Sequence, residues 1–217
     1  MFPRWLLYIA FFTLPLAVHA ADDEHPVNLT ADHPYVDIEI DGKSLRIERT
    51  QDTENMVDLD FALTSRACPP FCIQPIKLSE GVETIGELEL IDYIKRLADG
   101  DESVVIIDSR TGEWLSKGMI PGAINIPWST LNVEMASPRE VSEILELQLG
   151  ATFDEGLWNF DKAKTLVLYC NGPWCGQSPT SIRTLLSIGY PTHKLKWYRM
   201  GMPGWMMLGL TTVTPEE

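Results

Sequence analysis

Residues 166–179 read LVLYCNGPWCGQSP and are the most informative segment of the chain. The opening LVLY is a short apolar run of the kind that is buried on both faces in a parallel sheet. After a glycine-containing loop, Ser178 and Pro179 have the pattern of a helix start, with the serine as N-cap and the proline in the first turn. We therefore predict a strand, a loop and a helix, with Cys170 at the carboxyl end of the strand. Open α/β sheets place their functional sites at such points.

Strand and helix patterns alternate on both sides of this stretch. Residues 103–110 (SVVIIDSR) form a second apolar strand pattern, and residues 87–100 repeat apolar side chains at helical spacing: Leu88, Ile91, Ile94 and Leu97. The other elements that we expect are strands at 123–127 and 194–198, a short polar helix at 113–117, and helices at 138–149 and 178–189. Strands separated by helices predict an α/β fold, an open parallel sheet flanked by helices.

A small β element is expected before this sheet. Residues 35–49 alternate apolar and polar side chains on both sides of Asp41-Gly42, which is a strong hairpin signal. Residues 21–34 are polar and read as a leader. We expect an N-terminal region at 21–80, comprising this leader, the hairpin and a Cys-x3-Cys turn, followed by the main domain at 81–212.

The first twenty residues have the pattern of a secretory signal peptide. Arg4 precedes an apolar run that ends at Val18, and a small residue, Ala20, precedes the expected cut. We therefore expect export to the periplasm and no membrane association after cleavage. The alternative is an uncleaved N-terminal anchor.

Composition excludes some partners. The chain of 217 residues carries a net charge of −14 and no Lys/Arg-rich block, which argues against nucleic acid. The acidic surface would also repel an anionic substrate unless a local positive field exists at the site. Several methionines near the end, with His193, could suggest a soft-metal site, but they lack ligand spacing and we expect no metal and no cofactor: Met200, Met202, Met206 and Met207.

The four cysteines form two local pairs, Cys68 with Cys72 and Cys170 with Cys175, although three complete pairings are open. In an oxidising compartment, Cys68 and Cys72 would most simply close a structural disulfide across their proline-rich turn. The alternative is a second dithiol that passes electrons or sulfur to Cys170, which requires the turn to pack against the loop that follows Cys170.

Cys170 is the candidate nucleophile. The glycines of the loop let its amide hydrogens turn inward, and the following helix start adds partial positive charge, so a thiolate is favoured. Cys175 is close enough to attack an adduct on Cys170 and act as a resolving cysteine. The opposing interpretation is a structural Cys170–Cys175 disulfide. Candidate substrate-binding residues are Asn171, Gly172, Trp174, Gly176, Gln177 and Ser178.

Taken with its flanks, the loop resembles the rhodanese-like, or sulfurtransferase, superfamily. The matches run from about Val82 to Leu210 and comprise Asp108-x-Arg110, Gly118 to Ala123 with Met119 in place of a histidine, and Gly201 with Trp205. The resemblance implies that Cys170 carries a sulfane sulfur as a persulfide. We expect Asp108 and Arg110 to orient neighbouring loops through an ion pair, not to do chemistry.

The departures from the family pattern bear on substrate. Where common members carry Arg or Lys five residues after the nucleophile, this chain has Cys175, so thiosulfate turnover is put in doubt. The loop resembles that of the phosphatase-like branch in length but lacks its closing arginine, because Gly176 and Gln177 stand there. Arg183 is the next cation along the chain, and we expect it to be solvated.

Three functions follow from these patterns. The first is an exported sulfurtransferase that takes sulfur from a donor such as thiosulfate or polysulfide, with Cys170 as nucleophile and Cys175 as resolving cysteine. The second is thiol–disulfide exchange with a partner protein through the same pair. The third is a non-catalytic interaction module in which tryptophans surround a closed disulfide.

Overall fold

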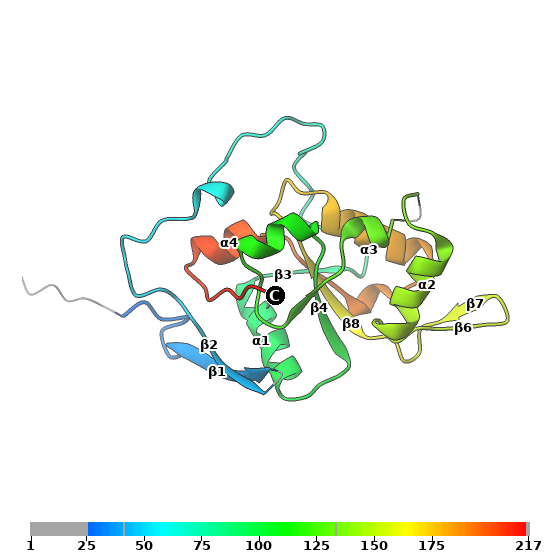
Figure 1. Cartoon of the computed structure of the whole chain (residues 1–217), viewed down its shortest axis with the longest axis horizontal. Coiled ribbons are helices and arrows are strands. Elements are labelled where there is room, and N and C mark those ends of the chain that lie inside the picture. The colour runs from blue at the N-terminus through cyan, green and yellow to red at the C-terminus, as the bar shows by residue number, and fades with distance from the viewer. Residues whose placement is uncertain (1–25, 41, 133, 216–217) are drawn as a thin grey trace, which may run out of the picture.

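The structure is a computed structural model that describes residues 26–40, 42–132 and 134–215. Its centre is a five-stranded parallel sheet with the strand order β3-β9-β8-β4-β5, flanked by helices as expected (Figure 1). The strands of this sheet are β3 (Glu83–Ile85), β4 (Val104–Asp108), β5 (Ala123–Asn125), β8 (Thr165–Tyr169) and β9 (Leu195–Tyr198).

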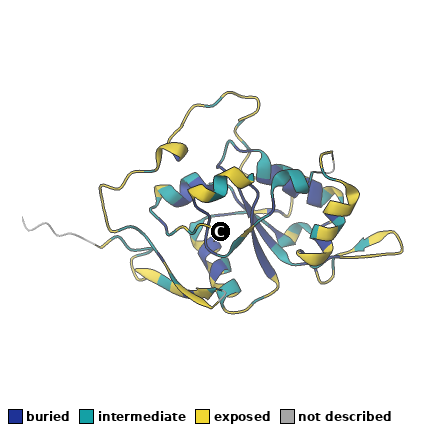
Figure 2. Ribbon diagram, viewed as in Figure 1, coloured by how far each residue is buried: buried dark blue, intermediate teal, exposed yellow. Residues whose placement is uncertain are grey.

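The helices cover both faces of the sheet because alternate strand side chains point to opposite sides. The helices are α1 (Glu87–Ala98), α2 (Pro138–Leu147), α3 (Gln177–Ser187) and α4 (Gly201–Met207), with 3₁₀ turns at Leu59–Phe61, Gly112–Lys117, Trp128–Thr130 and Thr192–Lys194. From β4, Val105 and Ile107 share one apolar core with α2 and α3, whereas Ile106 belongs to a second core with α1 and α4. The central strands are accordingly the most deeply buried part of the molecule (Figure 2).

The predicted N-terminal hairpin is confirmed as β1 (Tyr35–Ile40) and β2 (Lys43–Glu48), which pair antiparallel. It forms a two-stranded sheet of its own and does not extend the main sheet. Its buried Ile38 and Ile47 belong to the same apolar core as α1. An isolated bridge between Arg49 and Leu210 also ties the end of the hairpin to the end of the main domain.

Some local expectations were wrong. Ser178 is not the N-cap of α3, because the helix begins at Gln177 with Gly176 in the cap position, and the serine hydroxyl is used elsewhere. Leu88 is 50% exposed, and Leu90 takes its place in the core. A second hairpin, β6 (Thr152–Asp154) with β7 (Leu157–Asn159), lies in a connection where we expected only a helix.

The expected signal peptide lies outside the described residues. Within the described ranges, no helix is long and apolar enough to cross a membrane.

Candidate active site

Cys170 directly follows β8, and the backbone around it is held from both sides. Ser109 donates its amide to the carbonyl of Tyr169 (2.9 Å), and Met202 donates its amide to the carbonyl of Cys170 (3.0 Å). The start of α4 comes so close that a Cβ on Gly201 would lie 2.2 Å from the Cys170 carbonyl oxygen. Gly201 also has a φ of +58°, in the left-handed region that favours glycine. The loop that begins at Cys170 and the start of α4 thus pack backbone against backbone.

The Cys170 thiol is buried and faces Ser178. The Ser178 hydroxyl lies 3.1 Å from Cys170 Sγ and donates to it, while the indole of Trp197 donates to the same hydroxyl at 3.2 Å. Burial raises the pKa of the Cys170 thiol well above its ordinary value and Cys175 adds to the rise, whereas Ser178 opposes it through its hydroxyl and its amide. At neutral pH, Cys170 is therefore a protonated thiol held by a donor that would stabilise its thiolate.

Cys175 is the more acidic member of the pair. The neighbouring Cys170 side chain lowers the pKa of Cys175 below its ordinary value, against burial, and the backbone amides of Gln177 and Asn171 add to the fall. Cys175 Sγ itself donates to the side-chain oxygen of Gln177 at 3.4 Å. The backbone amides of Gln177 and Asn171 thus point toward the Cys175 thiol, although we expected the loop amides to stabilise Cys170. Both cysteines are free thiols in this structure. The Cys170 thiol faces the backbone carbonyl of Cys175, with Sγ and the oxygen 3.8 Å apart.

A pocket of about 540 Å³ opens beside this loop. Although both cysteines are buried, only Cys175 of the two lines it. The other lining residues come from three segments of the chain: Arg66, Pro70 and Phe71; Thr111, Glu113, Trp114 and Trp128; and Asn171, Trp174, Gly176, Gln177 and Thr180. A ligand in this pocket would meet Cys175 first.

The predicted binding residues divide into two groups. Asn171, Trp174, Gly176 and Gln177 line the pocket, whereas Gly172 and Ser178 do not. Gly172 shapes the loop, because its φ of +105° suits glycine and its carbonyl accepts from the amide of Cys175. The side-chain oxygen of Asn171 is buried without a hydrogen-bond partner among the described residues. A ligand donor could satisfy it.

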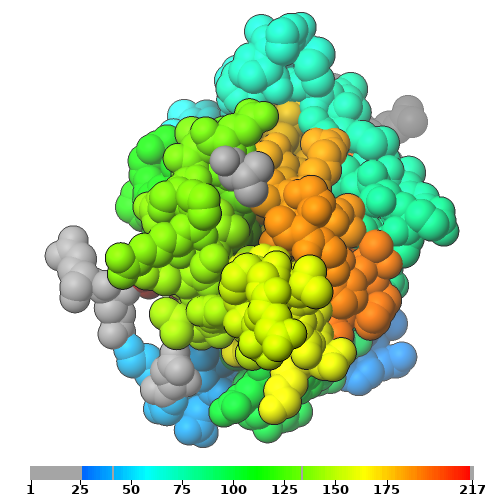
Figure 3. All heavy atoms as spheres, turned by 90° about the vertical axis from the view of Figure 1, so that its right-hand side faces the viewer, coloured from blue at the N-terminus to red at the C-terminus, as the bar shows by residue number. Residues whose placement is uncertain are grey.

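The Cys-x3-Cys turn packs against the same loop. Cys68 and Cys72 are joined by a disulfide, and between them Phe71 meets the ring of Trp174 edge-on, with centroids 5.6 Å apart. Just after the turn, the amide of Gln74 donates to the carbonyl of Pro173 at 2.8 Å. Figure 3 shows the turquoise atoms of this segment lying against the orange atoms of α3 and its neighbours. The packing that a relay from this turn to Cys170 would require is therefore present.

Asp108 and Arg110 lie under the site and outside the pocket. Their side chains are fully buried and form an ion pair at 2.6 Å. Arg110 also donates to the carbonyl of Gly118 (2.7 Å), and the hydroxyl of Tyr169 donates to Asp108 (3.0 Å). This network links β4, β8 and the segment that begins at Gly118.

The model of the rhodanese-like domain family matches residues 90–208, more than half of the chain. The chain belongs to the rhodanese-like family. No curated protein sequence matches it.

Several solved structures resemble this rhodanese-like chain at low sequence identity. A thiosulfate sulfurtransferase from Pseudomonas aeruginosa is 20% identical, with a TM-score of 0.43 over 65% of this chain and 22% of that one. A human single-domain sulfurtransferase is 24% identical, with a TM-score of 0.36 over 58% of this chain and 96% of that one. A protein from Rhodopseudomonas palustris, described as a possible tyrosine phosphatase, is 19% identical, with a TM-score of 0.43 over 70% and 100%.

The sequence did not predict that residues distant from the cysteine loop line the pocket of this rhodanese-like domain. Arg66 and Phe71 come from a segment about a hundred residues before the loop, and no local pattern predicts that they meet it. Trp114 follows the Asp-x-Arg motif closely, and this proximity was the one available signal. Arg183 does not line the pocket. It is exposed, as expected, with its guanidinium 3.5 Å from the Gln74 side chain.

Proposed function

We propose that this rhodanese-like chain is an exported, periplasmic sulfurtransferase in which the Cys170/Cys175 pair accepts sulfane sulfur and then resolves the persulfide. The observation that carries the proposal is the arrangement of the two thiols. Cys175, whose thiol pKa is lowered, lines a pocket, and the buried Cys170 lies next to it, with its Sγ 3.8 Å from the Cys175 carbonyl oxygen. A thiolate that can be reached by a ligand is what sulfur transfer needs.

The first step takes place on Cys175. Its thiolate attacks the sulfane sulfur of a donor such as thiosulfate or polysulfide, a sulfur–sulfur bond forms, and the donor leaves with the electron pair of the bond that breaks. From thiosulfate the leaving group is sulfite, and the protein keeps a Cys175 persulfide. An acceptor thiol can then take the terminal sulfur and restore the free Cys175 thiolate.

The second thiol offers another exit for the sulfur. Cys170 attacks the inner sulfur of the Cys175 persulfide, a Cys170–Cys175 disulfide forms, and the terminal sulfur leaves as hydrosulfide with the proton of Cys170. The cysteine pair is oxidised by two electrons and the transferred sulfur is reduced by two. A dithiol reductant, such as a partner protein, would then return the pair to its free thiols.

This order reverses the roles that the family resemblance implies. The sequence alone points to Cys170 as the persulfide carrier and Cys175 as the resolving cysteine. The reversal is supported first by geometry, since Cys175 lines the pocket and Cys170 does not, and the lowered pKa of Cys175 agrees with that placement.

Thiol–disulfide exchange is the second candidate. It is supported by the placement of both thiols in one loop, where Cys170 Sγ lies 3.8 Å from the backbone carbonyl oxygen of Cys175. In that reaction Cys175 would attack a disulfide of a partner protein, and Cys170 would release the reduced partner.

The decisive experiment follows mass, thiols and sulfide together. The reduced protein, with Cys68–Cys72 intact, is treated with thiosulfate or inorganic polysulfide. We expect a gain of one sulfur, about 32 Da, followed by loss of two thiols and release of one hydrosulfide per chain. If neither donor adds sulfur but the two thiols are oxidised by a disulfide substrate, the protein carries out thiol–disulfide exchange and not sulfur transfer. If the cysteine pair reacts neither with the sulfur donors nor with the disulfide substrate, the non-catalytic interaction module is the remaining function.

A further inference from the structure

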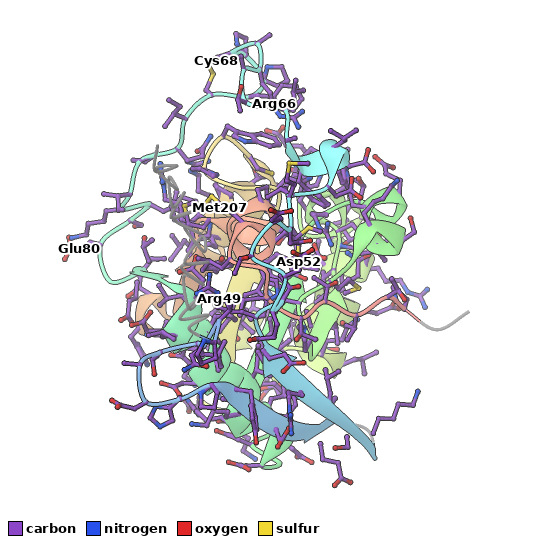
Figure 4. The ribbon with its side chains drawn as sticks, turned by 90° about the vertical axis from the view of Figure 1, so that its left-hand side faces the viewer. Arg49, Asp52, Arg66, Cys68, Glu80 and Met207 are labelled. Carbon is purple, nitrogen blue, oxygen red and sulfur yellow. A yellow bond between two sulfur atoms is a disulfide. The ribbon has the colours of Figure 1, made fainter. Side chains whose placement is uncertain are left out.

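The pocket contains a cation that the catalytic loop itself lacks. Arg66 lines the pocket together with Cys175, although the two residues are far apart in the chain. Figure 4 shows Arg66 on the same projecting loop as Cys68, close to the disulfide. The guanidinium lies 4.0 Å over the ring of Trp174 and 5.4 Å from the ring of Phe71. These aromatic contacts hold it against the loop that carries the reactive thiols.

Arg66 has no charged partner. In the part of the chain that the structure describes, no carboxylate pairs with it, and its Nε is buried without a hydrogen-bond partner. Glu113 lines the same pocket, but no ion pair joins it to Arg66. A guanidinium offers five donors arranged to bind a carboxylate or an oxyanion, and none of those of Arg66 is hydrogen-bonded to another described residue. In a chain of net charge −14, Arg66 supplies the local positive charge that an anion requires.

The rest of the pocket suits a body larger than an inorganic anion. At about 540 Å³ the pocket falls in the range that holds organic ligands. Its walls are rich in aromatic side chains: Phe71, Trp114, Trp128 and Trp174. The ligand that fits this pocket best therefore has an anionic group at one end and an apolar body.

We propose that Arg66 is the anion-binding residue of this site and that the substrate is an organic anion with an apolar body that carries a sulfane sulfur, of the thiosulfonate type. This rests on the proposed function and names its substrate class. With such a substrate, the Cys175 thiolate forms a bond to the sulfane sulfur. The bond from that sulfur to the sulfonyl group breaks, and an organic sulfinate leaves with the electron pair. Charge and sulfur balance without any further reactant.

The test separates binding from sulfur transfer by using an unreactive probe. Benzenesulfonate has the anion and the apolar body but no sulfane sulfur, and its binding is measured by calorimetry or by quenching of the pocket tryptophans. We expect benzenesulfonate to bind the wild type, and sulfate to bind much more weakly. Arg66→Met should raise the Kd by about tenfold or more, because a charge-assisted contact is lost. Arg66→Lys should restore part of the affinity, and Arg139→Met, the same charge change on exposed α2, should not alter it.

The transfer reaction is then measured with benzenethiosulfonate and with inorganic polysulfide. Arg66→Met should lose about tenfold in kcat/KM with benzenethiosulfonate and much less with polysulfide. Equal Kd values for wild type and Arg66→Met, or equal binding of sulfate and benzenesulfonate, would overturn the substrate class while leaving sulfur transfer intact. Binding of benzenesulfonate that depends on Arg66, with no sulfur gained from any donor, would uphold the anion site and reject the transfer reaction and its thiosulfonate substrate.

Discussion

The hydroxyl of Ser178 lies 3.1 Å from the sulfur of Cys170 and donates its hydrogen to that sulfur. Because Ser178 is completely buried and accepts a hydrogen bond from Trp197, its hydroxyl is oriented before any ligand arrives. It supports the thiolate of Cys170, whose pKa burial raises well above its ordinary value. In the mechanism that we propose, Ser178 is thus a positioning residue for the second step, in which Cys170 must lose its proton.

Ser178→Ala should therefore slow resolution without slowing sulfur uptake. The variant removes the hydroxyl that lowers the pKa of Cys170, so hydrosulfide release should require a higher pH, whereas formation of the Cys175 persulfide should keep its rate. The indole of Trp197 also loses its acceptor, which should lower the free energy of unfolding by about 1–3 kcal/mol.

The matched control is Ser181→Ala. Ser181 is also buried in α3, but its hydroxyl faces the carbonyl of Gln177 within the helix. It should leave the pH profile of hydrosulfide release unchanged. A Ser178→Ala profile that coincides with the wild type would show that the hydroxyl has a structural role only.

Cys175 should react with iodoacetamide at a lower pH than an ordinary thiol. A lowered pKa means that the thiolate is present below about pH 8.5, where an unperturbed cysteine is largely protonated. Cys170→Ala removes the largest cause of the lowering, so the midpoint of the alkylation rate at Cys175 should move to higher pH. Peptide mass spectrometry across a pH series measures this. An unchanged or lower midpoint in Cys170→Ala would refute the coupling between the two thiols.

Arg110→Leu should destabilise the fold strongly. It leaves the carboxylate of Asp108 buried without its cation, and breaking a buried pair in this way costs about 3–5 kcal/mol. Urea denaturation measures the loss. Arg139→Leu, which breaks an exposed pair with Glu143, should hardly change the midpoint. Similar midpoints for the two variants would mean that the buried pair does not hold the loops.

Gly201→Ala should disturb the site from outside the pocket. A Cβ would approach the Cys170 carbonyl to 2.2 Å, so the backbone of α4 or of the cysteine loop must move, and the left-handed φ adds about 1–2 kcal/mol of strain. We expect lower stability and a slower reaction of Cys175. Gly112→Ala is the control, because a Cβ there meets nothing within 4 Å. Full activity and stability in Gly201→Ala would contradict the close approach.

The sheet and the place of Cys170 could be predicted from the sequence because both depend on local patterns. A short apolar run such as residues 104–107 predicts a buried strand, and the glycines after β8 predict a loop. The use of Ser178 could not be predicted, since a serine at a helix start can cap the backbone or, as here, turn to a buried sulfur. The place of Arg66 in the pocket could not be predicted for a different reason. Its contact with Trp174 joins segments separated by more than a hundred residues.

The central claim is that sulfur enters at Cys175 and that Cys170 resolves it. The most direct test exposes Cys170→Ser and Cys175→Ser to the same sulfane sulfur donor and locates the added sulfur by peptide mass spectrometry. We predict a stable persulfide on Cys175 in Cys170→Ser, with no hydrosulfide released, and no persulfide in Cys175→Ser. A persulfide on Cys170 in Cys175→Ser, with none on Cys175 in Cys170→Ser, would contradict the account and return Cys170 to the role of the first nucleophile.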